Sequence, residues 1–582
     1  MTGFFSTLAT IWRIAIPYFR SEDAWPGRIL LAAVIGIELA IVGITVLLNQ
    51  WNNRFYTALQ DRNWDGFVSE LLYFCVLAVI YIVFAVYQLY LNQWLQIRWR
   101  RWLTAGYLGH WLEGSNHYRM QLLGDAADNP DQRISEDIRL FVERTLQLSV
   151  GLLGAIVSLA SFVVILWNLS AVAPLHLFGE TWNIPGYLVW AALLYALLGT
   201  AITHLIGRPL IGLNFMQQRY EADFRFNLIR VRENSEQIAL LDGETIERDR
   251  LMDRFGALMR NWLAIMTRTK RLTFFTAGYA QVSSVFPVVV ASPAYFAGLF
   301  QLGGLTQTAS AFGSVQGALS YFINVYGQFA EWRAVIERLA GFDIAIATAR
   351  ALETGTPALK VERRKSATAV DIKGLEVRLP LGRPLVAAKE IALAAGDHVL
   401  VNGPSGSGKS TLFRAIGGIW PFGSGSVSVP DGARVMILPQ RPYLPIGSLA
   451  AATSYPASTD RFDAATLRNV LIAVGLPAFA DRLAEEAHWN RMLSLGEQQR
   501  IALARAILHA PDFLFLDEAT ASLDEPAEAA LYKLLYERLP RATIVSIGHR
   551  STLAAFHRRH LVLEPEGDLF RVQERGFEAT AS

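Results

Sequence analysis

Long apolar runs constrain this sequence more than any other feature. A helix needs about 20 consecutive apolar residues to cross a bilayer. Runs approaching that length occur at Ile29–Asn49, Leu71–Leu91, Leu148–Leu169, Tyr187–Leu205, Phe274–Phe300 and Leu305–Phe329. The last run is the weakest, because small and polar residues interrupt it. Some runs could instead be buried helices of a soluble protein, but their repetition and a charged fraction of only 18% favour an all-α domain of six membrane helices.

Arginine is distributed unevenly between these runs, which predicts an orientation. Segments 98–144 and 208–271 are rich in arginine, whereas Ser170–Gly186 and Gln301–Gly304 contain neither lysine nor arginine. Six crossings would place both termini and the two basic segments in the cytoplasm. The basic segments continue the flanking helices, so the second and fourth helices are expected to leave the membrane, turn and return.

The N-terminal segment, the cysteine count and the net charge indicate which kinds of partner the chain can bind. Met1–Arg20 alternates apolar residues with arginines and lacks a small-residue cleavage site, which predicts an amphipathic helix lying on membrane lipid. Cys75 is the single cysteine, which excludes an intrachain disulfide and a cysteine metal cluster. A formal charge of +2 gives no indication of a nucleic-acid partner.

The pattern changes in the second half of the chain. Residues 1–344 are expected to form the membrane domain and residues 345–369 a polar, irregular linker. From residue 370 to 582, short β-rich runs such as Val370–Leu379, Ile391–Val401 and Phe513–Leu516 alternate with helical patterns. This alternation predicts an α/β nucleotide-binding domain.

A glycine-rich loop carries the strongest motif in that domain. It matches G-x-x-x-x-G-K-[ST] and lies between an apolar strand, His398–Val401, and a helical pattern, Leu412–Ile416. Glycines let backbone N–H groups surround phosphate oxygens, the lysine reaches the β- and γ-phosphates, and the first hydroxyl binds Mg²⁺. The sequence therefore predicts an ATP site formed by Gly403, Pro404, Ser405, Gly406, Ser407, Gly408, Lys409, Ser410 and Thr411.

A buried strand, Phe513–Leu516, ends in two carboxylates. Asp517 is predicted to contact Mg²⁺, and Glu518 is predicted to polarise the attacking water. The alternative is that Glu518 only favours the start of a following helix.

Leu493–Arg500, with Ala521–Asp524 and the two motifs above, resembles the ATP-binding cassette (ABC) family over about residues 370–575. The resemblance implies that Ser494, Gly496 and neighbouring Glu497 form the signature that contacts ATP held by another subunit, with Asp524 nearby. Gln440 resembles the glutamine that senses Mg²⁺, and His549 resembles the switch histidine that holds the γ-phosphate. One cassette then needs a second signature, and a second copy of this chain is the simplest source.

Two departures from the cassette pattern have consequences. Leu495 stands where most signatures have glycine and Glu497 where many have glutamine; hydrolysis is still expected, because the serine and second glycine remain. No aromatic residue lies between Phe342 and Phe413 to stack on adenine. Adenine is therefore expected to pack on aliphatic atoms around Leu379–Arg383, with ATP and GTP competing nearly equally.

The membrane half also carries family resemblance. Trp51–Gln60, Asn129–Asp137, Glu221–Phe226 and Val231–Ala239 are similar to the SbmA/BacA-like ABC transporters of bacteria, and also to the peroxisomal fatty-acyl half-transporters. The resemblance implies an exporter-type fold with short coupling turns that rest on the cassettes. Through the first group it implies import of peptides, cobalamin or other small hydrophilic cargo. The expected location is a bacterial inner membrane, and a peroxisomal membrane is the alternative that the second group implies.

Polar residues in the sixth and second helices bear on the cargo. On the sixth helix, small and polar residues recur every three or four positions: Gly313, Gly317, Ser320, Asn324, Gln328 and Glu331. The second helix adds Tyr81, Gln88 and Asn92 at similar spacing. These stripes predict either the lining of a water-filled cavity or close helix packing. Glu38 lies in the middle of the first run, where it could bind cationic cargo, couple to protons, or only hydrogen-bond within the bundle. Outward transport of lipids or drugs, a fatty-acyl transporter, and an ATP-gated channel or sensor remain alternatives.

Overall fold

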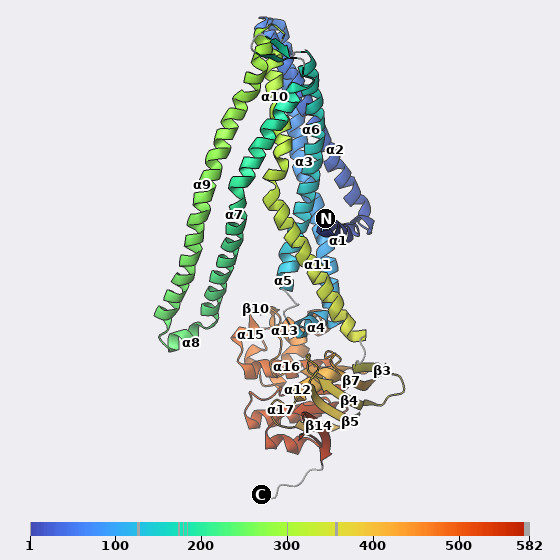
Figure 1. Ribbon diagram of the computed structural model, residues 1–582. Helices are drawn as coiled ribbons and strands as arrows, with labels where there is room; N and C mark the ends of the chain where they lie inside the picture. The colour runs from blue at the N-terminus through green and yellow to red at the C-terminus, as the bar shows by residue number, and fades with distance from the viewer. Residues whose placement is uncertain are drawn as a thin grey trace. The chain divides into compact units, whose positions relative to one another are not determined.

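The computed structural model describes residues 2–124, 129–172, 175–177, 180–182, 184–299, 301–354 and 359–575. The chain forms two compact units (Figure 1). The first unit comprises Met1–Leu108 and Asn129–Gly341, and the second comprises Gly109–Asp128 and Phe342–Ser582. Phe300, parts of the Ser170–Gly186 segment and residues 355–358 of the expected linker lie outside the described residues.

The first unit is helical, as the apolar runs predict. A short helix, α1, is followed by a 3₁₀ turn at Tyr18–Arg20, and a small hairpin of β1 and β2 (Leu175–Leu177, Glu180–Trp182) joins α6 to α7. Its helices are α1 (Thr2–Ala15), α2 (Ala24–Gln60), α3 (Trp64–Leu112), α5 (Pro130–Gln132), α6 (Ile138–Val172), α7 (Tyr187–Glu233), α8 (Ser235–Leu240), α9 (Glu244–Phe296), α10 (Leu302–Asn324) and α11 (Tyr326–Thr354).

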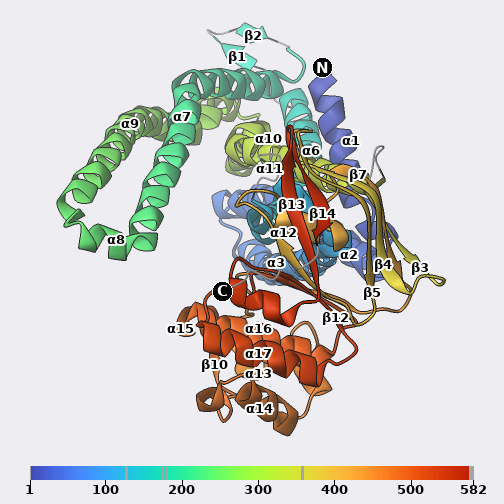
Figure 2. The same ribbon diagram turned by 90° about the horizontal axis from the view of Figure 1, so that it is seen from below.

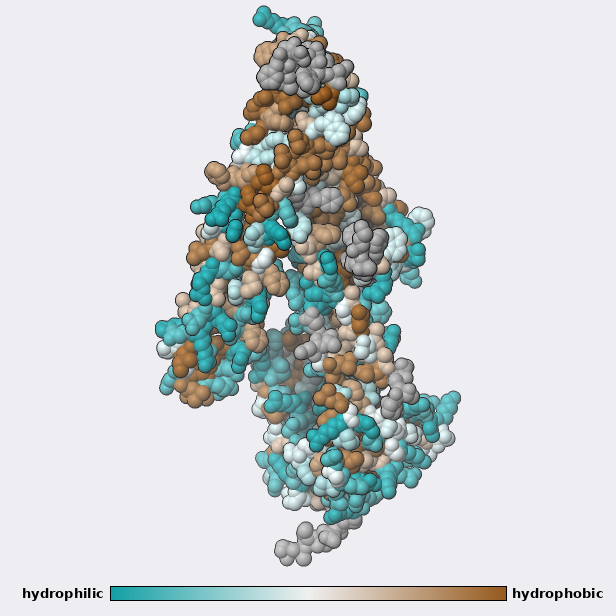
Figure 3. Space-filling view, viewed as in Figure 1, coloured by the Kyte–Doolittle hydropathy of each residue, from teal (hydrophilic) through white to brown (hydrophobic). Residues whose placement is uncertain are grey.

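Among the described residues, five helices are long and apolar enough to cross a membrane: α2, α3, α6, α7 and α9. Helices α3, α7 and α9 contain 49, 47 and 53 residues. At 1.5 Å per residue each is about 70–80 Å long, more than twice the hydrocarbon thickness of a bilayer. The prediction that the second and fourth helices continue far beyond their apolar runs is therefore confirmed. Figure 3 shows apolar side chains over the upper part of this unit and hydrophilic ones along the lower parts of α7 and α9.

The sixth run differs from a simple spanning helix. It forms α10 and the start of α11, with an interruption at Val325. The hydrogen bonds from Val325 N to Tyr321 O and from Phe329 N to Val325 O persist across the interruption, at 3.0 and 2.8 Å. The helical pattern of main-chain hydrogen bonds therefore continues on both sides of the interruption.

Helices α7 and α9 run side by side and are joined by α8 (Figure 1). Tyr195 and Tyr279 fasten them, because each hydroxyl donates to the main-chain oxygen of the other residue, at 2.7 and 3.1 Å. Their rings stack with centroids 4.5 Å apart. Asn261 adds bonds to Leu213 O and Gln217 Oε1, both 2.9 Å. These contacts make the pair one extended arm.

The expectation of an irregular linker at residues 345–369 is wrong for most of its length. Helix α11 continues to Thr354, and β3 already occupies Leu359–Arg364 as a parallel neighbour of β7. Most β3 side chains are exposed. An edge strand with an exposed polar surface lacks the apolar alternation that identifies strands in a sequence.

The second unit is built on a ten-stranded sheet with the order β3-β7-β4-β5-β14-β13-β6-β12-β11-β8. Strands β13, β6, β12, β11 and β8 are mutually parallel neighbours, whereas β4 is antiparallel to both β5 and β7. The strands are β3 (Leu359–Arg364), β4 (Ala369–Arg378), β5 (Pro384–Ala394), β6 (His398–Asn402), β7 (Gly423–Pro430), β8 (Val435–Leu438), β11 (Phe513–Asp517), β12 (Thr543–Ile547), β13 (Arg559–Glu566) and β14 (Leu569–Arg575), with a separate pair β9 (Gly447–Ser448) and β10 (Glu486–Ala487).

Helices pack against the parallel strands. Figure 2 shows α13, α14, α16 and α17 gathered on one side of the unit. The helices of this unit are α4 (Asn116–Leu122), α12 (Lys409–Ile416), α13 (Leu449–Ser454), α14 (Ala464–Ala473), α15 (Trp489–Met492), α16 (Leu495–His509) and α17 (Glu525–Arg538). Continuous buried strands such as β12, with no exposed residue, are expected where both faces of a parallel sheet are covered.

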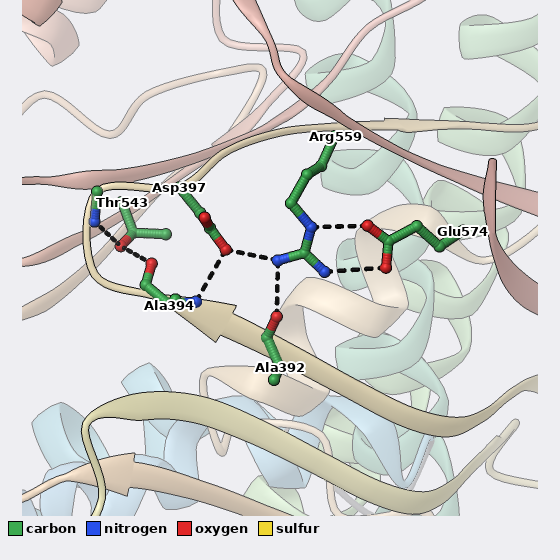
Figure 4. Close-up of polar contacts among 7 residues, drawn as sticks. Ala392, Ala394, Asp397, Thr543, Arg559 and Glu574 are labelled. Atoms are coloured by element: carbon green, nitrogen blue, oxygen red, sulfur yellow. Dashed lines mark hydrogen bonds and ion pairs between the residues drawn. The ribbon is translucent and has the colours of Figure 1, made fainter. Parts of the chain in front are cut away.

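An arginine links the two parts of the sheet at the base of β6 (Figure 4). Arg559 on β13 makes a bidentate pair with Glu574 on β14, at 2.7 and 3.0 Å. It also donates to Asp397 and to the main-chain oxygen of Ala392 on β5. The hydrogen bond to Glu574, and then that to Asp397, raise the pKa of Arg559. This network fixes the strand that carries the glycine-rich loop.

Helix α4 belongs to the second unit although it lies between two helices of the first. Leu122 packs against the cluster of buried side chains formed by the sheet and α12. Arg119 and Met120 are buried, and Glu113 at the end of α3 pairs with Arg350 on α11. The described residues 109–124 therefore pack as part of the second unit, and their role as a coupling turn stays a prediction.

Candidate ATP site

The glycine-rich loop has the predicted strand–loop–helix setting, between β6 and α12. Gly406 and Gly408 have φ values of 78° and 90°, a region that residues with a Cβ avoid. At Gly408 a Cβ would also lie 2.6 Å from Val386 Cγ2. These glycines keep the loop backbone close to β5 and open on its other side, as a cradle for phosphate requires.

Lys409 is the buried cation of this loop. Its Nζ donates to the main-chain oxygens of Gly403 and Pro404, 2.9 Å each. Burial lowers the pKa of Lys409, and the carboxylates of Glu518 and Asp517 act in the opposite direction. Ser407 is fully buried and its hydroxyl has no hydrogen-bond partner among the described residues. A lysine held only by carbonyls and an unpaired hydroxyl beside it fit a phosphate group.

Ser410 and Asp517 meet at the start of α12. Ser410 Oγ donates to Asp517 Oδ1 at 2.8 Å. Burial raises the pKa of Asp517, although the Ser410 hydrogen bond and nearby Arg414 oppose the change. A hydroxyl and a carboxylate at the tip of β11 are oxygen ligands of the kind that Mg²⁺ takes, so these residues fit the predicted magnesium role.

Glu518 follows directly and is surrounded by the other predicted residues. Its Oε2 accepts a hydrogen bond from Gln440 Nε2 at 3.0 Å, and its Oε1 lies 3.3 Å from His549 Nε2. Glu518 has a φ of 51°, a conformation that costs a residue with a Cβ about 1–2 kcal/mol. No helix begins at Glu518, since α17 starts at Glu525. The carboxylate thus lies between two polar side chains, which suits a group that orients water.

The predicted signature residues lie on the first turn of α16. Ser494 is the N-cap, and its backbone N and Oγ both donate to Glu497 Oε2 at 2.8 Å. Gly496 packs closely, because a Cβ there would lie 3.3 Å from Ser522 O. Asp524 caps α17 by accepting from Ala527 N at 2.8 Å. Unlike Gln440, Glu518 and His549, these residues are held by contacts within their own helix starts and the neighbouring loop.

Comparison with known proteins agrees with this architecture. Residues 11–296 match the family described as ABC transporter transmembrane region 2, and residues 388–521 match the ABC transporter family. An uncharacterized ABC transporter ATP-binding protein of Haemophilus influenzae is 36% identical over 556 residues, covering 96% of this chain and 92% of the relative. The chain belongs to the ABC transporter family. Its second unit is therefore an ATP-hydrolysing cassette whose reaction is coupled to transport.

Other relatives of this ABC transporter have more informative names. The inner membrane ABC transporter ATP-binding protein YddA of Escherichia coli is 34% identical over 538 residues, covering 92% of this chain and 93% of the relative. The human lysosomal cobalamin transporter ABCD4 is 24% identical over 594 residues, covering 95% and 94%. The structure of a bacterial Atm1-family ABC exporter with ATP bound has a TM-score of 0.70 at 18% identity, covering 94% and 95%. This last likeness establishes the exporter fold of the chain.

The turn expected to hold adenine is well formed. Leu379 N donates to Arg383 O, and Gly382 N donates to Leu379 O, both at 2.8 Å. Leu381 stands at the tip of this turn with its side chain 99% exposed. The turn therefore offers an aliphatic surface to solvent, and the pairing of adenine with it stays a prediction.

Two arginines of the transporter were not singled out in the sequence. Arg505 on α16 is buried and donates to Tyr443 O at 2.8 Å and to Ala452 O at 2.9 Å. Burial lowers its pKa to about 10. Arg550, next to His549, donates to Leu523 O at 2.7 Å. Both arginines donate mainly to main-chain oxygens, which no residue pattern displays, although Arg550 also lies 3.4 Å from Glu528. Only their position beside known motifs could have indicated them.

Proposed function

We propose that this chain forms a homodimeric, ATP-driven transporter that moves hydrophilic cargo, such as peptides or cobalamin-like compounds, into bacteria by alternating access. The inner-membrane location named for YddA and the cargo named for ABCD4 support the compartment and the substrate class. The positive-inside rule supports cytoplasmic termini and cassettes. The SbmA/BacA-like resemblance supports the inward direction.

In the proposed ATPase reaction, Lys409 binds the phosphates and Ser410 with Asp517 would hold Mg²⁺, which supplies charge neutralisation at the phosphates when bound. Glu518 orients the attacking water, and His549 contacts the γ-phosphate. Gln440 donates to Glu518, and this contact supports the proposed role of its amide in sensing Mg²⁺ and water. The contacts among these residues and the chemistry of each residue type support the proposed roles.

The dimer follows from incomplete sites and from an unpaired arm. Ser494 and Gly496 have no phosphate loop of their own to contact, so a second copy must present one. Large apolar side chains on the lower half of the α7–α9 arm are exposed in the single chain, including Phe215, Trp262 and Met266. Such surface in a single chain marks an interaction site, and a symmetric partner is the simplest occupant.

A polar face on the membrane helices carries the cargo proposal. Gly313 and Gly317 are exposed, and a Cβ at either would meet no described atom within 4 Å. These glycines therefore do not pack closely against another described helix of the same chain. Asn324, about two turns after Gly317, is exposed as well. Together these residues favour a water-filled path over a lipid-facing surface.

Glu38 supports the same path. It is the one Asp, Glu, Lys or Arg in the six apolar runs. Gln88 on α3 donates to its carboxylate, and Gly154 on α6 leaves the space that its other oxygen fills. A carboxylate at this depth with an amide as its described donor is expensive in lipid and marks a functional position.

The test is uptake of labelled cobalamin and of a labelled cationic peptide by bacteria that lack their own transporters and express this chain. The parent is compared with Glu518→Gln and with Glu525→Gln, an exposed carboxylate at the start of α17. Glu518→Gln should reduce uptake by about a hundredfold, in line with the loss of one general base. Glu525→Gln should leave uptake unchanged.

The other readings predict different results. Equal uptake by the parent and Glu518→Gln would indicate an ATP-gated channel or sensor. If the cells take up no cargo although the purified protein hydrolyses ATP, import is rejected. The search then turns to efflux of lipids, drugs or fatty-acyl compounds. A purified parent that hydrolyses no ATP would reject the transporter mechanism itself.

A further inference from the structure

Gln499 lies on the second turn of α16 with its side chain fully buried. Its amide makes two hydrogen bonds, and both leave the helix. Nε2 donates to the main-chain oxygen of Gln440, and Oε1 accepts from the backbone N of Ser522, each at 3.0 Å. One side chain therefore joins the signature helix to two loops that are 59 and 23 residues away.

Both loops lead directly to the reacting groups. Gln440 donates its own side-chain amide to Glu518 Oε2 at 3.0 Å. Ser522 lies in Ala521–Asp524, between Glu518 and α17. Arg550 holds that loop from the other side, with Nη1 donating to Leu523 O at 2.7 Å. A chain of direct contacts thus runs from α16 through Gln499 to the water-orienting carboxylate and to the switch loop.

We infer that Gln499 is a positioning residue of the ATPase, which makes the signature helix, the Gln440 loop and the Ser522 loop move as one body. Ser494 lies at the start of the same helix, so a contact made there with the partner's ATP would displace Gln440 and Ser522 together. The inference rests on the proposed dimer for this consequence. The three-way connection itself is a property of the single chain.

The position requires an uncharged side chain that can both donate and accept a hydrogen bond, as an amide does. The side chain must donate to one main-chain oxygen and accept from one main-chain nitrogen, and no water replaces it in a fully buried site. A leucine would leave both loop groups unpaired. An ionised glutamate would keep the acceptor and lose the donor, whereas a protonated glutamic acid would supply both.

The neighbouring Gln498 offers a matched control. Its Nε2 also makes two bonds, to Asn490 O and Leu493 O at 3.0 and 2.8 Å. Both accepting residues lie in the few positions before α16, next to the signature residue Ser494. Removing Gln498 therefore deletes two hydrogen bonds without separating the signature helix from the Gln440 and Ser522 loops.

The experiment measures MgATP hydrolysis by the purified full-length dimer in lipid nanodiscs, for the parent, Gln499→Leu, Gln499→Glu and Gln498→Leu. Gln499→Leu should lower kcat about tenfold, with KM for ATP within about twofold of the parent, because phosphate binding is not touched. Gln498→Leu should keep kcat within about twofold. The melting temperature of each protein is recorded in parallel.

The pH profile separates positioning from a structural role. A buried glutamate can have a pKa of about 8–9. The ratio of Gln499→Glu activity to parent activity should therefore be near one at pH 6.5 and fall about tenfold by pH 9.5, as the acid loses its donor proton.

Three results would overturn the inference: parental kcat for Gln499→Leu, an equal kcat loss for Gln498→Leu, or a Gln499→Glu ratio that does not change with pH. If Gln499→Leu fails to fold, the glutamate profile still decides, because the protonated form keeps both bonds. A parent without ATPase activity is a separate result, which rejects the proposed function and not the connection through Gln499.

Discussion

At the residue scale, the phosphate loop keeps its charges in partly dehydrated positions before any ligand arrives. Asp517 has the clearest cost, because burial disfavours its ionised form and raises its pKa. A carboxyl group whose pKa is higher in the folded state binds its proton more tightly there. The stability that it contributes is therefore present at low pH and is lost as pH rises from its ordinary pKa through the raised one.

Asp517→Asn should accordingly stabilise the protein while it inactivates the enzyme. At pH 7.5, without nucleotide and with EDTA, we expect Tm to rise by about 2 °C, because the substitution removes a desolvated charge. The gain should shrink as pH is lowered, since the parent carboxyl then becomes protonated. ATPase activity should fall at least about a hundredfold, because the substitution removes the carboxylate that is proposed to hold Mg²⁺.

The control for that prediction is Asp568→Asn, an exposed aspartate in the turn between β13 and β14. It should change neither Tm nor activity. A lower Tm for Asp517→Asn at pH 7.5 would mean that the Ser410 hydrogen bond outweighs the desolvation of the carboxylate.

At the scale of elements, the sequence predicted those features whose determining residues are close together in the chain. The strand, glycine loop and helix at 398–416 were predicted because turn glycines, buried strand and helix start are contiguous. The linker was assigned wrongly because α11 and the edge strand β3 expose polar residues, which look irregular without their partners. Gln499 was missed because its role depends on main-chain atoms of two distant loops, which no residue pattern displays.

Helix α4 gives an element-scale prediction, since it is a short helix held by a few buried side chains. Leu122→Ala removes part of the contact with the core around α12 and should weaken docking by about 1–2 kcal/mol. Basal ATPase activity should stay within about twofold, because no residue of the ATP site is touched. On the proposed transport mechanism, cargo uptake should fall several-fold, because the coupling turn that α4 is expected to form would be held less firmly on the cassette.

The measurement compares ATP hydrolysed with labelled cargo taken up, in the same cells. Gln121→Ala, which changes an exposed neighbour, should leave both values at the parental level. Parental uptake by Leu122→Ala would show that α4 does not transmit the motion. A collapse of basal hydrolysis would instead assign Leu122 to the folding of the cassette.

At the scale of the whole molecule, the residues predicted to bind ATP fall into two groups within the single chain. Lys409, Asp517 and Glu518 converge on one another, whereas Ser494 and Gly496 lie on a separate helix start whose contacts stay local. The exposed apolar side chains of the α7–α9 arm indicate that the chain is equally incomplete within its membrane unit. A dimer accounts for both features, because each copy would supply its signature to the phosphate loop of the other and would cover the other's α7–α9 arm.

Composite sites make a prediction that no monomeric ATPase satisfies. Lys409→Ala should inactivate the phosphate loop and Ser494→Ala the signature, so each variant alone should be inactive. Co-expressed in equal amounts, half of the dimers are mixed, and each mixed dimer has one complete site. Activity should therefore recover to about a quarter of the parental value. A mixture of Lys409→Ala with the double variant contains no complete site and should stay inactive; recovery no greater than in that mixture would contradict sites shared between subunits.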